Sequence, residues 1–223
     1  MPLREELMEI RDPVLRKVRD HPFWSGLRDG SLPGEALARF VEQDTGFLLP
    51  AYARALARCA AAAPDSADTL LLGRSIVGTL TSRAEMRRRY ADMAREEGLP
   101  GLDEQADVEP ATHAHASFFA AAGTMSFHAG IGALLPMAWF HADVSDDLRD
   151  NVAAGSRYEP WSRIYHPGET FRPAVQELVD MTGRAGEAAA EPQRRALVEQ
   201  FLLGARYEWA FAESCLRRSP WPV

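Results

Sequence analysis

The sequence predicts an all-α protein that folds as a helical bundle. Apolar residues recur at spacings of three and four over most of the chain, as they do on one face of an amphipathic helix. Strand signals, which are alternating β-branched runs closed by Asn-Gly or Asp-Gly turns, are missing from the sequence. The chain has 223 residues, 46% of them hydrophobic, which suits one globular unit. We therefore expect a single helical domain over residues 1–223.

The first half of the chain is expected to form four helical segments. They are a helix over 3–20, a short one over 22–27, a long one over 35–63, and another that begins at 64–66 and ends near 98. The Gly- and Pro-containing stretch 30–34 separates the second from the third. We expect a bend near Pro50, because proline has no amide hydrogen to donate inside a helix.

A loop rich in Pro, Gly and Asp over 99–109 leads into the second half of the chain. The helices expected there cover 110–122, 126–151, 158–165, 168–184 and 189–217. The stretch 183–191 is rich in Ala, Gly and Glu and is interpreted as a surface connection. Because the connections between these helices are short, neighbouring helices are expected to pack side by side in one bundle.

Composition excludes several classes of function. Lys17 is the only lysine and has no Gly-rich loop beside it, which argues against Schiff-base chemistry and Walker-type phosphate binding. The net charge of −7 argues against a nucleic-acid partner. Two cysteines cannot build a disulfide framework, and the charged N-terminal stretch does not resemble a signal peptide. No apolar run reaches the ~20 residues of a membrane span, so we expect a cytoplasmic protein with no membrane partner.

Ionisable residues interrupt the apolar faces of several expected helices. In the last helix, Glu208 interrupts the face formed by Leu197, Phe201, Gly204, Phe211 and Cys215. In an earlier helix, Asp44 interrupts the face formed by Phe40, Phe47 and Ala51. His141 lies one turn beyond Met137, and His115 lies in a stretch of small apolar residues. A buried carboxylate persists only with partners or with a changed pKa. These side chains either converge on one cavity or serve as separate structural polar groups.

A metal site is not expected from the sequence. Di-iron bundles carry Glu-x-x-His pairs on facing helices, and the best local match here, Glu85 to Arg88, has arginine in place of the histidine. Asp143 follows His141 by two positions, and that spacing points two helical side chains apart. We therefore predict no metal and no cofactor.

Several short motifs resemble the TenA family (thiaminase II, aminopyrimidine aminohydrolase), in the same order from about residue 20 to 215. They are His21-Pro22-Phe23, Asp29-Gly30-Ser31-Leu32-Pro33, Gln43-Asp44, Ala84-Glu85-Met86, Ala133-Leu134-Leu135-Pro136 and Tyr207-Glu208. The resemblance implies a heme-oxygenase-like helical bundle with a closed pocket, assembled as a homo-oligomer, either a dimer or a tetramer. It also implies a small planar heteroaromatic ligand such as an aminopyrimidine.

The resemblance assigns roles to individual residues. The family's aspartate, which holds the ring nitrogen and amino group of the pyrimidine, matches Asp44, and its late glutamate, which handles protons, matches Glu208. A tyrosine after a short helix matches Tyr165. These three are the predicted catalytic residues. The predicted substrate-binding residues are Asp44, Phe47, His115, Met137, His141, Tyr165 and Phe211.

The chain departs from the family at the nucleophile. The family's cysteine follows the Ala-Leu-Leu-Pro motif, where this sequence has Met137. A thioether has no ionisable proton and cannot replace a thiolate. Cys59 and Cys215 match no catalytic position of the family, so we interpret them as core residues.

Two classes of function follow from these observations. The first is a TenA-like enzyme of thiamin-pyrimidine salvage that hydrolyses an aminopyrimidine by a cysteine-independent acid/base route. The second is a repurposed bundle. It could be an oxidase, either PqqC-like or dependent on a metal held by His115, His141, Asp44 and Glu208, or a non-catalytic ligand-binding or regulatory protein. The sequence leaves open whether the protein is an enzyme.

Overall fold

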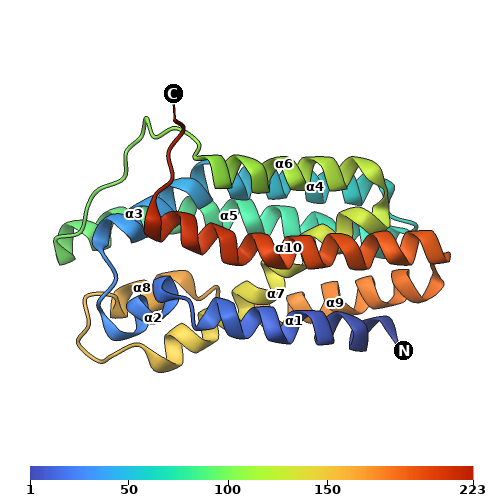
Figure 1. The fold of residues 1–223 in the computed structure, drawn as a ribbon, viewed down its shortest axis with the longest axis horizontal. Helices are drawn as coiled ribbons and strands as arrows, with labels where there is room; N and C mark the ends of the chain where they lie inside the picture. The colour runs from blue at the N-terminus through green and yellow to red at the C-terminus, as the bar shows by residue number, and fades with distance from the viewer. Residues whose placement is uncertain (223) are drawn as a thin grey trace.

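The computed structural model describes residues 1–222, and helices joined by loops make up this part of the chain (Figure 1). The all-α prediction is confirmed, and no strand occurs among these residues. In order, the helices are α1 (Leu3–Arg19), α2 (Pro22–Asp29), α3 (Gly34–Gln43), the π-helical turn η1 (Asp44–Leu48), α4 (Leu49–Ala62), α5 (Ser66–Glu97), α6 (Pro110–Met125), α7 (Phe127–Asn151), α8 (Glu159–Tyr165), α9 (Phe171–Ala188) and α10 (Glu191–Arg217).

Helices α7 and α10 pack directly against each other along the bundle. Figure 1 shows α10 running the length of the molecule, with α4 and α6 on one side and α1 and α9 on the other. A Cβ atom on Gly132 would lie 2.3 Å from the carbonyl oxygen of Leu197, and one on Gly204 would lie 2.7 Å from that of Ala133. Both distances are too short for any side chain. Glycine at these two positions therefore lets the two backbones touch.

The ends of the long helices follow ordinary capping chemistry. Asp65 begins α5 by accepting a hydrogen bond from the backbone amide of Asp68 at 2.9 Å, and Ser126 begins α7 by accepting one from Ala129 at 3.1 Å. Gly98 ends α5 with a left-handed φ of 64°, a conformation that glycine adopts without a steric penalty.

The helix expected over 35–63 is interrupted before Pro50 rather than at it. In η1 the amide of Leu49 donates to the carbonyl of Asp44, five positions back. The next such bond would join the carbonyl of Thr45 to residue 50, but Pro50 has no amide hydrogen. The Nε of Arg83 from α5 donates to that carbonyl instead. The π-helical turn thus inserts one residue into the helical register.

The prediction of a surface connection over 183–191 is also wrong for most of that stretch. Helix α9 continues to Ala188 and includes two glycines of that stretch. A Cβ atom on Gly186 would lie 2.1 Å from the side chain of Leu3 in α1, so this glycine is a packing contact. Tertiary packing against α1 therefore outweighs the weak helix propensity of glycine.

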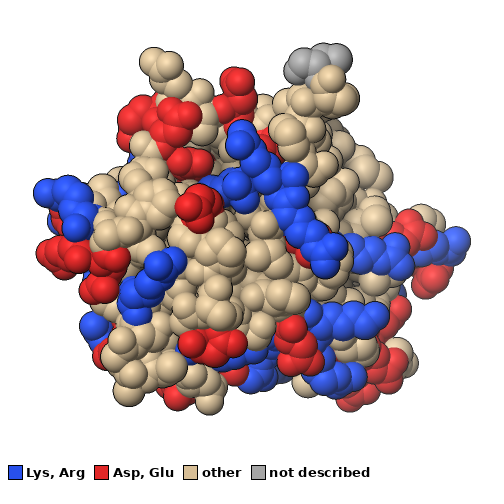
Figure 2. Space-filling model, turned by 60° about the vertical axis from the view of Figure 1, so that its left-hand side comes forward, with Lys and Arg blue, Asp and Glu red and all other residues tan. Residues whose placement is uncertain are grey.

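Acidic and basic side chains lie next to one another around a central uncharged area on the face in Figure 2. Neither sign of charge dominates this face, in keeping with the mixed charge of the sequence. Within the described part of the chain, none of the helices combines the length and hydropathy that crossing a bilayer requires.

Replacing Gly132 with alanine tests the contact between α7 and α10. The added Cβ meets backbone atoms of Leu197, so we expect Gly132→Ala to lower the free energy of unfolding in urea by about 1–3 kcal/mol. Gly183→Ala, inside α9 with no atom near its added Cβ, should instead raise it by about 0.5–1 kcal/mol. Equal effects of the two substitutions would contradict the close approach of the helices.

Candidate active site

A cavity of about 450 Å³ lies inside the bundle. Its inner wall is largely apolar and aromatic, and includes Trp24, Phe40, Phe140 and Phe211. Five titratable side chains also line it: Asp44, Tyr52, His141, Tyr165 and Glu208. The lining continues to exposed residues of α5 and of the first turns of α9, among them Arg74, Gly78, Ser82, Pro173 and Glu177. This exposed part is the rim through which a small molecule would enter.

Most of the predicted site residues line this cavity. They are Asp44 from η1, Met137 and His141 from α7, Tyr165 from α8, and Glu208 and Phe211 from α10. Met137 therefore faces the same space as both carboxyl groups. Met137 follows Asp44 by 93 residues and Glu208 follows it by 164 residues, and the fold brings all three together.

Two predicted residues lie outside the cavity. Phe47 lines a separate surface hollow together with Gly46 and Pro50. The extra residue in η1 rotates Phe47 off the face of Asp44 and brings Leu48 and Tyr52 onto that face instead. His115 is buried behind Glu208, with 3.8 Å between its Nε2 and Glu208 Oε1.

Sequence reasoning missed Tyr52 and Trp24. Tyr52 follows Asp44 by eight positions, and a search at spacings of four and eight would have found it. Its hydroxyl donates to the carbonyl of Leu134 at 3.3 Å, and burial raises the pKa of this phenol. Trp24 packs against Tyr165 with ring centroids 5.4 Å apart, and its buried Nε1 has no hydrogen-bond partner in the part of the chain that the structure describes. No periodicity of the short helix α2 pointed to a role for this tryptophan.

The two carboxyl groups of the cavity have raised pKa values. Burial raises the pKa of Asp44 to about 7. Burial, together with the negative charge of Asp44, raises the pKa of Glu208 to about 8. The pair therefore carries at least one proton near neutral pH, and its members exchange protons in the range where enzymes run acid/base chemistry.

His141 holds the backbone of Tyr165. Its Nε2 lies 3.0 Å from the carbonyl oxygen of Tyr165, and a carbonyl only accepts, so Nε2 carries the hydrogen. The two rings are 4.5 Å apart. Burial lowers the pKa of His141 to about 4 and outweighs the opposing effect of this hydrogen bond, so the ring is neutral at pH 7.

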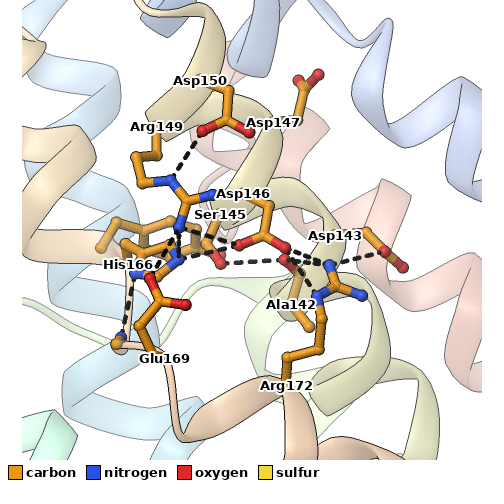
Figure 3. Close-up of polar contacts among 12 residues, drawn as sticks. Ala142, Asp143, Ser145, Asp146, Asp147, Arg149, Asp150, His166, Glu169 and Arg172 are labelled. Carbon is orange, nitrogen blue, oxygen red and sulfur yellow. Dashed lines mark hydrogen bonds and ion pairs between the residues drawn. The ribbon is translucent and has the colours of Figure 1, made fainter.

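A polar cluster around Asp146 fixes the segment between α8 and α9 (Figure 3). Asp146 Oδ1 is 2.9 Å from Nε2 of His166, and its Oδ2 accepts from Nε of Arg172 at 2.8 Å. Nδ1 of His166 in turn accepts from the amide of Gly168 at 3.1 Å. Partial burial acts to raise the pKa of Asp146, but the bonds from Arg172 and His166 outweigh it and lower this pKa. Since Pro167, Thr170 and Phe171 line the cavity, this cluster holds one of its walls.

The two thiols are unsuited to nucleophilic catalysis. Both cysteines are buried. Burial raises the pKa of Cys59 to about 12 and that of Cys215 well above its ordinary value, so neither forms appreciable thiolate near neutral pH. Neither lines the cavity.

The donor set proposed for a metal-dependent oxidase does not assemble. Among residues 1–222, no three side chains of His, Cys, Asp or Glu are grouped as ligands of one metal ion. The Nε2 of His141 is engaged with a backbone carbonyl, and His115 lies outside the cavity.

We compared the chain with a family model, with known protein sequences and with solved structures, and the three comparisons agree with one another. A family model described as the TENA/THI-4/PQQC family matches residues 8–218. The chain is 27% identical over 218 residues to the thiamine biosynthesis multifunctional protein ThiED of Corynebacterium efficiens, covering 97% of this chain but only 29% of that longer protein. It is 26% identical over 204 residues to the aminopyrimidine aminohydrolase of Bacillus subtilis, covering 90% of this chain and 84% of that enzyme. Among solved structures, a TenA homologue from P. horikoshii OT3 superimposes with a TM-score of 0.78 at 22% identity, over 97% of this chain and 99% of that one.

The buried carboxyl groups should make stability depend on pH. The pKa values of Asp44 and Glu208 rise from their ordinary 3.8 and 4.5 to about 7 and 8 in the folded protein. At a pH between these two pairs of values, the two carboxyl groups bind more protons in the folded state than in the unfolded state. Below about pH 6.5 the buried His115 and His141, with pKa values lowered to about 3 and 4, act in the opposite direction, because the unfolded state binds more protons at these two groups. The free energy of unfolding should therefore fall mainly as pH rises from 6.5 to 8.5, by a few kcal/mol at ~1.4 kcal/mol per pKa unit. The double variant Asp44→Asn/Glu208→Gln should flatten this dependence. Glu199→Gln, an exposed change on α10, should leave it unchanged.

Removing the Asp146 carboxylate should loosen the cavity wall. Without the bonds to His166 and Arg172, we expect Asp146→Ala to accelerate hydrogen exchange of amides 168–170 about 5–30-fold, as for ~1–2 kcal/mol of local stability. Glu199→Ala removes an exposed carboxylate of α10, outside this cluster, and serves as the control. An unchanged exchange rate in Asp146→Ala would show that the wall is held by other contacts.

Proposed function

The chain belongs to the TENA/THI-4/PQQC family, and we propose that it is a hydrolase of thiamin-pyrimidine salvage that acts on an aminopyrimidine without a cysteine nucleophile. The observation that carries this proposal is the pairing of Asp44 and Glu208, both with raised pKa, in a cavity that Met137 also lines. The sequence resemblance implies that Met137 stands where the family has its cysteine. The relatives named as aminopyrimidine aminohydrolases support the substrate class.

The apolar and aromatic wall suits a flat heteroaromatic ring. Phe40 and Phe211 contribute aromatic surface, and a pyrimidine between such side chains gains stacking contacts. Asp44 is the polar group that would orient the ring, since a carboxyl group can bond both a ring nitrogen and an adjacent amino group. The Nε1–H of Trp24 and the hydroxyl of Tyr165 are further groups at this end of the cavity.

Glu208 is assigned the proton transfers. In the proposed reaction the C–N bond of the pyrimidine's aminomethyl substituent breaks and a C–O bond to water forms, which yields a hydroxymethylpyrimidine and ammonia. Protonated Glu208 gives its proton to the leaving amine, and the resulting carboxylate takes a proton from the attacking water. The raised pKa of about 8 keeps this proton available near neutral pH.

Assay of the purified protein with a 5-aminomethyl-pyrimidine or its formyl derivative tests the proposal. We expect hydroxymethylpyrimidine to form, and Glu208→Gln to lower kcat/KM by about 10²–10⁴-fold because the acid/base group is lost. Asp44→Asn should also lower it strongly through loss of substrate orientation. Glu199→Gln, an exposed change on the same helix, should retain full activity.

The same assay decides whether catalysis is independent of cysteine. The Cys59→Ser/Cys215→Ser double variant and wild-type protein treated with iodoacetamide should both keep their activity, because the thiols are buried and protonated and do not line the cavity. Loss of activity in both would return the reaction to a thiol route. Ligand binding without turnover would favour a non-catalytic binding protein.

A further inference from the structure

His115 stands out among the buried groups that the proposed reaction does not use. It is 1% exposed, and both of its ring nitrogens lack a hydrogen-bond partner within residues 1–222. Oε1 of Glu208 is also buried and unpartnered, and it lies 3.8 Å from Nε2 of His115. Buried polar atoms in proteins are nearly always paired, so unpaired atoms that face one another indicate a functional arrangement.

The ring of His115 is held in place by aromatic contacts. It stacks on Tyr207 with centroids 4.9 Å apart and 12° between the planes, and it lies 4.5 Å from Phe119. Tyr207 immediately precedes Glu208 on α10. The separation of 3.8 Å exceeds a hydrogen bond by less than about 1 Å, so a small movement of the carboxyl group closes it.

The two oxygens of Glu208 have different surroundings. The side chain of Glu208 keeps 18% of its surface exposed and lines the cavity, yet Oε1 is fully buried on the side of His115. A partner that occupies Oε1 leaves the remainder of the carboxyl group directed toward a bound ligand.

We propose that His115 is a positioning residue whose Nε2 accepts the hydrogen of the protonated Glu208 Oε1 in the ligand-free protein and so holds this proton until a substrate binds. Rotation of the carboxyl group about its terminal bond, which has a broad two-fold torsion, then turns the proton toward the leaving amine. This inference rests on the proposed function, in which Glu208 transfers protons. It moves His115 from the predicted set of substrate-binding residues to the support of the acid/base group.

The protonation states agree with this geometry. Burial lowers the pKa of His115 to about 3, so its ring is neutral and one nitrogen accepts. Burial and Asp44 raise the pKa of Glu208 to about 8, so its carboxyl group holds the hydrogen at neutral pH. Because an acceptor on the acid stabilises the protonated form, His115 should raise the pKa of Glu208 further.

Other titratable groups also surround Glu208. They are Asp44 from η1, Tyr52 from α4, His141 from α7 and Tyr165 from α8, while α5 and α9 contribute Arg74 and Glu177 at the exposed rim. All of these remain in place in a variant of His115. A change in the titration of Glu208 in such a variant therefore reports on His115.

The test is a ¹³C NMR titration of the Glu208 carboxyl carbon in the full chain, with no substrate present. His115→Phe keeps the aromatic stacking but removes both nitrogens, and we expect it to lower the pKa of Glu208 by about one unit, a tenfold change in the protonation equilibrium. His115→Gln provides an amide oxygen as acceptor and should recover most of this shift. His113→Phe, an exposed histidine on the same helix, should cause none. An unchanged or raised pKa in His115→Phe overturns the proposal.

A second measurement needs no substitution. The ¹⁵N shifts of the His115 ring in the wild-type chain should show hydrogen on Nδ1 and a bare, accepting Nε2 between pH 6 and 7.5. Hydrogen on Nε2 in that range would overturn the proposal even if His115→Phe failed to fold. Because neither NMR experiment uses turnover, absence of aminopyrimidine hydrolysis alongside the expected shifts would contradict only the proposed function.

Discussion

The backbone contact between α7 and α10 at Gly132 and Gly204 is the constraint on which the rest of the arrangement depends. Once two helices are in contact at glycine, the residues that follow on the same faces must lie beside each other. Glu208 and Phe211 follow Gly204 by four and seven positions on α10, and both face the cavity. His141 and Met137 reach it from α7. The remaining helices close the space that this pair opens.

The sequence was sufficient to predict most of the helices, because they depend on local periodicity, and most of the residues that it singled out line the cavity. Asp44 and Glu208 were identified as polar residues within apolar rows, and both line the cavity. Phe47 was misplaced because the π-helical turn shifts the register by one residue, and the carbonyl of Thr45 that this turn leaves free accepts from Arg83 of another helix. The helical state of Gly186 likewise depends on Leu3 in α1. Such long-range contacts leave no local pattern in the sequence.

Burial makes a carboxyl group better suited to proton transfer near neutral pH and makes a thiol less suited to it. It raises the pKa of every group that is charged when deprotonated. For the thiol of Cys59 this moves the pKa to about 12, away from neutral pH, and makes the group inert. For the carboxyl groups of Asp44 and Glu208 the same effect moves the pKa to about 7 and 8. An apolar bundle interior thus favours carboxyl groups over thiols as carriers of protons.

Gly78 lies on the rim of the cavity, and a Cβ atom there would meet no other atom within 4 Å. A side chain at this position of the rim would therefore fit without any shift of the backbone and would narrow the entrance. The buried carboxyl groups lie on other helices and are independent of it. A substitution at the entrance can therefore alter which ligands pass into the cavity while the two buried carboxyl groups keep their positions.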